Sequence, residues 1–175
     1  INKQKIMISL LSFLGLIIGY ILASKTEEEL KQGYKYLKLL NIIVLLTLVI
    51  ILLISSKFNF IFIISFILGI LINYFIKRVY LFLSLILVLF NFSDKKLLLS
   101  IIVFIFGLVY GTLQYIKFKK INYKDILINF ILFIIPFILL FTQVTSIYKD
   151  YLNYFAIGGI TIAIINSKFK KEKRT

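Results

Sequence analysis

Apolar residues fall into seven long runs along this chain, and charged residues stand between the runs. The runs cover residues 6–23, 39–56, 58–76, 79–93, 97–116, 126–148 and 151–167, and none of them contains Asp, Glu, Lys or Arg. A helix needs about 20 apolar residues to cross a hydrocarbon core of ~30 Å. The pattern therefore predicts an all-α polytopic transmembrane helix bundle of about seven spans, with residues 1–175 forming a single integral membrane domain.

The fourth run, 79–93, is the shortest of the seven. Either Lys77 and Arg78 form a tight turn between two helices, or residues 58–93 make one kinked element that buries both cations. Burying them would cost about 2.5–3.5 kcal/mol each on insertion scales. The turn is therefore the expected arrangement.

Composition agrees with a membrane protein. The chain is 61% hydrophobic with a mean hydropathy of +1.03, whereas soluble domains are roughly 45–50% apolar. The longest polar stretch, residues 24–38, is too short for an aqueous domain. Thr26 and Glu29 stand at capping-box spacing there, so we expect a short interfacial helix that ends near Gly33.

The net charge of +14 comes from Lys and Arg beside the apolar runs. In a seven-span arrangement, 15 of these residues lie on one side and 6 on the side of the N-terminus. The positive-inside rule then predicts a cell-membrane protein with its N-terminus outside and its C-terminus in the cytoplasm. The expected partner of the basic residues is anionic lipid headgroups, and no nucleic acid is expected.

Small residues recur every fourth position in several runs. Such faces let helix backbones approach closely in lipid, either within one bundle or against a membrane protein partner or a second copy. The candidate helix-packing residues are Gly15, Gly19, Ala23, Gly69, Gly107, Gly111, Gly159 and Ala163.

The same glycines suggest an internal repeat. Gly15 and Gly19 match Gly107 and Gly111 at a constant offset of 92 residues. Spans one to three would then correspond to spans five to seven, with the fourth span as a connector. The prediction is a 3+1+3 pseudo-repeat whose two halves run parallel.

Residue types that carry catalysis are scarce. The chain has no His and no Cys, which excludes thiolate nucleophiles and the commonest zinc and haem ligands. The acidic residues outside Glu27–Glu29 occur singly, so none forms a pair suited to metal-bound chemistry. We expect no catalytic residue, cofactor or metal site, and no enzyme activity.

Two functions remain. The first is a non-catalytic membrane subunit or scaffold that associates through its small-residue faces, and it is the preferred interpretation. The second is a transporter or binding component for a neutral or lipophilic small solute, with a helix kink expected at Pro136. Its solute path would use the polar residues of the spans beside that kink: Asn73, Thr112, Gln114, Asn129, Pro136 and Thr161.

Overall fold

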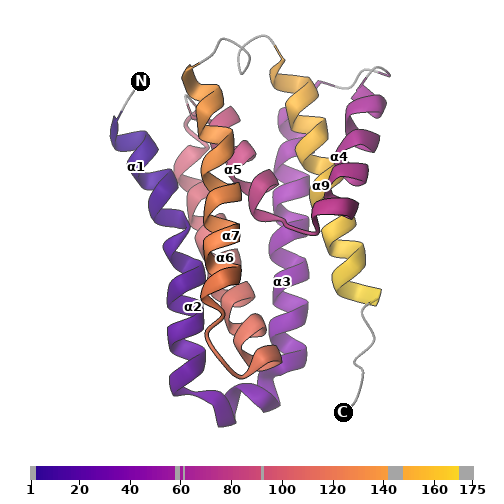
Figure 1. Ribbon diagram of the computed structural model, residues 1–175. Helices are drawn as coiled ribbons and strands as arrows, with labels where there is room; N and C mark the ends of the chain where they lie inside the picture. Colours follow the sequence, from indigo (N-terminus) through magenta and orange to yellow (C-terminus); the bar gives the residue numbers. More distant parts are fainter. Residues whose placement is uncertain (1–2, 58–59, 61, 92, 142–147, 170–175) are drawn as a thin grey trace.

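A computed structural model describes residues 3–57, 60, 62–91, 93–141 and 148–169. Every regular element in this part of the chain is a helix (Figure 1). The elements are α1 (Lys3–Ser12), α2 (Leu14–Lys25), α3 (Glu27–Ser55), α4 (Phe62–Ile76), α5 (Tyr80–Leu89), α6 (Lys96–Phe118), α7 (Tyr123–Ile134), the 3-10 helix η1 (Ile135–Phe141) and α9 (Lys149–Phe169).

Four of the helical segments are long and apolar enough to cross a membrane. They are Ile6–Lys25, Gln32–Ser55, Lys96–Phe118 and Tyr123–Leu140. The first combines α1 and α2, which meet at a turn at Phe13, and the last combines α7 with η1. Helix α9 is 21 residues long but carries more polar side chains and falls outside this set. In Figure 1 the start of α1 lies in the upper part of the bundle, and α9 runs downward and stops above the lower ends of α2 and α3.

Helix α3 differs from the expectation for the polar stretch 24–38. The helix is continuous from Glu27 to Ser55 and passes through Gly33 without a break. Thr26 does not cap it, because the Thr26 hydroxyl donates to the carbonyl of Leu22 at 3.0 Å. A glycine inside a helix costs only about 1 kcal/mol relative to alanine, which the apolar span that follows can offset.

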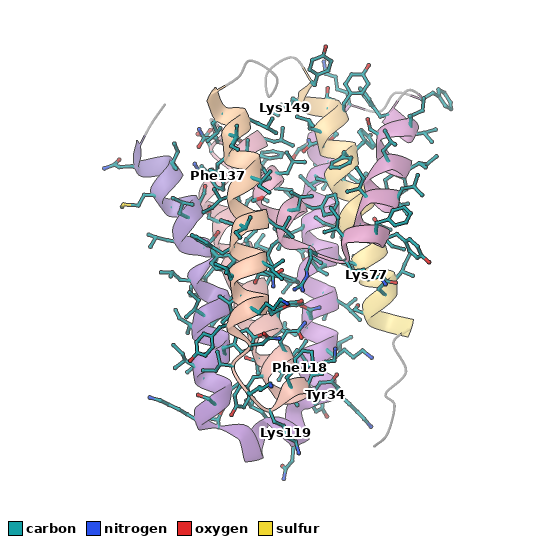
Figure 2. The ribbon with its side chains drawn as sticks, in the orientation of Figure 1. Tyr34, Lys77, Phe118, Lys119, Phe137 and Lys149 are labelled. Atoms are coloured by element: carbon teal, nitrogen blue, oxygen red, sulfur yellow. The ribbon has the colours of Figure 1, made fainter. Side chains whose placement is uncertain are left out.

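Helices α4 and α5 form a short hairpin in which α4 lies at the edge of the bundle against α9 and α5 lies inside it (Figure 1). With 15 and 10 residues they measure about 22 and 15 Å, less than the ~30 Å hydrocarbon core. Lys77, at the joint between them, lies between the level of Lys149 and that of Phe118 (Figure 2). Residues 82–90 are all buried, and α5 packs against α6, α7, η1 and α9. Helix α5 is therefore a core element surrounded by longer helices.

Two helix pairs pack backbone to backbone, and glycines line both contacts. Helix α2 lies along α6, where a Cβ on Gly15 or Gly19 would collide with the backbone carbonyl of Phe104 or Leu108. On the other side of this contact, a Cβ on Gly107 would stand 2.7 Å from the amide nitrogen of Leu16. The glycines of α2 and α6 thus face each other directly.

Helices α4 and α9 make the second close pair. A Cβ on Gly69 would collide with the carbonyl of Phe155, and one on Gly158 with the carbonyl of Phe66. Gly159 instead faces the ring of Phe82 on α5. Of the remaining packing candidates, Gly111 lies against the backbone of α2, Ala23 is buried and Ala163 is partly buried.

Pro136 lies where the helix that begins at Tyr123 changes from α-helical to 3-10 geometry. Helix α7 ends at Ile134, and the chain continues as the 3-10 helix η1. Proline has no N–H to donate to the carbonyl four residues earlier, and its ring crowds that carbonyl. The tighter 3-10 geometry at this point accommodates both constraints.

Candidate functional site

The end of α4 is fixed by one asparagine. Asn73 is buried one turn after Gly69, and its side-chain amide donates to the carbonyl of Gly159 on α9 at 2.5 Å. Its side-chain oxygen accepts from the backbone N–H of Arg78 at 3.0 Å. Between them, Lys77 adopts a left-handed conformation with a φ of 55°. The close α4–α9 contact thereby sets where the backbone of Arg78 lies.

Arg78 forms an ion pair with Asp125 inside the bundle. Its guanidinium donates to Asp125 Oδ1, while 25% of the Arg78 side chain and 10% of the Asp125 side chain are exposed. Asp125 stands in the first turn of α7, and its backbone N–H donates to the side chain of the N-cap residue Asn122 at 3.2 Å. A carboxylate at this position is also favoured by the helix dipole.

Two further side chains contribute to the pair. Asn129, one turn along α7, donates to Asp125 Oδ2 at 3.1 Å, and its oxygen lies 3.5 Å from Arg78 Nη1. The hydroxyl of Tyr20, on α2, donates to Asp125 Oδ2 at 3.4 Å. The carboxylate therefore accepts hydrogen bonds from the hairpin joint, from α2 and from α7.

Two more tyrosines surround this ion pair. Tyr80, at the start of α5, and Tyr110, on α6, lie within electrostatic range of Asp125, and their ring centroids are 5.8 Å apart. Gln114 interacts with the Tyr110 hydroxyl. Tyr80 is 1% exposed, and its hydroxyl has no hydrogen-bond partner among the described residues. A buried hydroxyl without a partner is unusual and calls for an explanation.

The structure separates the residues of the predicted solute path. Asn73 and Asn129 both meet Arg78, and Gln114 reaches the same region through Tyr110. Thr112 instead joins α6 to α2, donating to the carbonyls of Leu108 at 2.8 Å and Gly19 at 3.3 Å.

The other two path residues are not linked to the ion pair by any described hydrogen bond. Thr161 bonds within its own helix, to the carbonyl of Ile157 at 2.8 Å. Pro136 is buried at the start of η1, three turns of chain beyond Asp125. The six residues therefore do not form one continuous line.

Sequence reasoning missed Arg78 and Asp125 as a pair, together with the three tyrosines. Arg78 was expected in a tight turn, and such a turn does occur at residues 77–79. The expected cost of burying the Arg78 cation took no account of a carboxylate that could pair with it. One signal was present, because the charge count assigns both residues to loops on the same side of the membrane.

The centre that results is polar, partly buried and without net charge. Among the described residues, no group of three His, Cys, Asp or Glu side chains could hold a metal ion. Arg78 and Asp125 offer one cationic donor and one anionic acceptor, and the tyrosines and amides around them offer further hydrogen bonds. Such an arrangement is suited to holding a small polar molecule.

Comparison of the chain with models of protein families, with curated proteins and with solved structures finds no match. The class is thus defined by the fold alone. Four helices of membrane-spanning length and composition support an all-helical transmembrane protein, and its polar centre lies beside the joint between α4 and α5.

Proposed function

We propose that this chain is a non-catalytic, multi-pass cell-membrane protein that binds or transports a small solute of no net charge. The observation that carries the proposal is the Arg78–Asp125 pair at the joint of two short helices. Charged residues within a membrane bundle are costly and most often mark a solute or ion pathway. Broken or short helices that meet inside a bundle are a common setting for solute sites in transporters.

The proposed topology has the N-terminus outside and the C-terminus in the cytoplasm. We place α4 and α5 as a re-entrant hairpin between five longer crossings, in place of two of the seven full spans. Since the hairpin returns to the side from which it enters, both counts give the same sidedness for the other loops. The lengths of α4 and α5 support this arrangement.

A membrane subunit or scaffold is the competing function. That role was expected to act through small-residue helix faces on a partner or a second copy. The glycines of α2, α4, α6 and α9 instead meet helices of the same chain. Gly33 alone among the glycines has open space beside it, and it belongs to no small-residue face. A subunit would therefore need a different docking surface.

Solute flux through the purified protein tests the proposal. The protein is reconstituted into lipid vesicles, and swelling rates are measured with glycerol, alanine and glycine betaine as osmolytes. We expect faster entry of at least one solute than into protein-free vesicles, and a slower rate with Asn129→Leu. Thr161→Val is the matched control and should leave the rate unchanged, because the Thr161 hydroxyl donates to the carbonyl of Ile157 within α9.

Recovery from the native membrane separates the two functions. A solute-handling bundle should be recovered in mild detergent without a stoichiometric partner. Recovery with a fixed partner, together with neither flux nor saturable binding of any of the three solutes, would refute the proposal and favour the subunit.

A further inference from the structure

Asp125 and Arg78 are each held by several groups in the described structure. Asp125 accepts from Arg78, Tyr20 and Asn129. The residue exposures show that the pair is only partly open to its surroundings. Any ligand that binds here must therefore compete with contacts that already satisfy both charges.

The chemistry of the pair restricts which solutes can compete with these contacts. A cation that displaced Arg78 would leave a guanidinium without its counter-ion, and an anion that displaced Asp125 would leave a carboxylate in the same state. An unpaired charge in a partly buried site is strongly unfavourable. A neutral polyol offers only dipoles to replace two full charges. A zwitterion re-pairs both groups at once, with its carboxylate on Arg78 and its ammonium on Asp125.

The tyrosines supply the remaining interactions. The buried hydroxyl of Tyr80, which lacks a partner in the described structure, is a donor available to a ligand carboxylate. The hydroxyl groups of Tyr20, Tyr80 and Tyr110 all interact electrostatically with Asp125, and that of Tyr20 donates to it.

We propose that the solute is a small zwitterion carrying one ammonium and one carboxylate group, bound between Arg78 and Asp125 with the Tyr80 hydroxyl as an additional donor. The inference rests on the proposed function for its physiological role. Binding itself can be measured without transport. The two ideas therefore fail separately.

The experiment measures equilibrium binding of radiolabelled glycine betaine and alanine to the purified full-length protein in detergent. We expect saturable binding of at least one of them, and no competition by glycerol. Arg78→Gln and Asp125→Asn should each abolish it. Their matched controls, Lys77→Gln and Asp94→Asn, change exposed charges beside the site and elsewhere, and should bind like the wild type.

Tyr80→Phe keeps the test decisive if the charge variants do not fold. It removes a hydroxyl with no described partner, so thermal stability should be unchanged or higher. Zwitterion affinity should fall about tenfold, as expected for one lost hydrogen bond to a charged group. An unchanged affinity would remove Tyr80 from the site and overturn the proposal.

The remaining outcomes are also decisive. Glycerol flux without zwitterion binding would overturn this inference and leave the proposed function standing. Zwitterion binding without flux of any solute would leave this inference standing and would overturn the transport role. Zwitterion binding that survives both charge substitutions would place the site elsewhere and refute the pair as its centre.

Discussion

Substituting Gly107 by alanine tests whether the α2–α6 contact holds the bundle together. The added Cβ would stand 2.7 Å from the Leu16 nitrogen and 2.9 Å from the Gly15 carbonyl carbon, whereas ordinary contacts begin at 3.4 Å. The helices would have to separate by about 0.7 Å, and a gap of that size forfeits a quarter to a half of the dispersion attraction. The atoms it meets are backbone atoms, which cannot rotate away.

Overpacking of this kind costs up to about 3 kcal/mol, and the better helix propensity of alanine returns about 1 kcal/mol. We therefore expect Gly107→Ala to lower the free energy of unfolding by about 2 kcal/mol. Gly33→Ala is the matched control, because it has the same chemistry inside α3 with nothing within 4 Å of the new atom. That substitution should raise stability by about 0.5–1 kcal/mol.

The assay is unfolding of the purified protein in mixed micelles by increasing sodium dodecyl sulfate, followed by circular dichroism. The reasoning predicts opposite signs for the two variants. Equal shifts of Gly107→Ala and Gly33→Ala in either direction would show that the α2–α6 contact yields freely, and the backbone packing argument would then be wrong.

Three other changes test the hairpin, the helix break and the sidedness. Arg78→Gln should destabilise the protein by about 2–3 kcal/mol in the same assay, because the carboxylate it leaves is mostly buried, while Lys77→Gln should stay within about 0.5 kcal/mol; equal losses would contradict a specific pair. Pro136→Ala supplies an N–H and should slow amide hydrogen exchange around η1, and unchanged exchange there would contradict proline as the cause of the 3-10 geometry. In this cysteine-free chain, Lys57→Cys should be labelled from outside intact cells and Lys119→Cys only after permeabilisation, and the reverse pattern would invert the proposed topology.

Helix positions follow from local signals, which is why the sequence predicts them well. A long run of apolar residues without charge indicates a helix whatever surrounds it, and four of these helices reach membrane-spanning length. The break at Pro136 is equally local, since it depends on one missing N–H. The glycine spacing is also readable, because small residues on one helical face permit close approach. The sequence does not say which faces meet, and it gave no reason to expect Gly158 in the α4–α9 contact.

The role of α5 could not be predicted from its residues. A helix that is apolar all round is buried, but burial in lipid and burial in protein leave the same pattern. Residues 79–93 therefore read equally well as an outer span and as an inner helix. What distinguishes the two is length, and the helix proper covers only Tyr80–Leu89. Lys77 and Arg78 mark where α5 begins, but they do not indicate whether lipid or protein surrounds it.

The ion pair could not be predicted from the sequence, for a different reason. Arg78 and Asp125 lie 47 residues apart, and each looks like an ordinary loop charge in the sequence. Their meeting depends on two glycine contacts. Gly69 brings α4 against α9, so that Asn73, one turn further, can hold the backbone of Arg78.

The α2–α6 contact acts in the same way from the other side. Gly19 meets α6 at Leu108, and the next residue on α2, Tyr20, donates to Asp125. Tyr110 follows on α6 within two residues of that contact, in electrostatic range of the same carboxylate. The small-residue faces therefore do more than hold helices together. They set the positions of the groups that surround the ion pair, so close packing and the polar centre are consequences of the same few glycines.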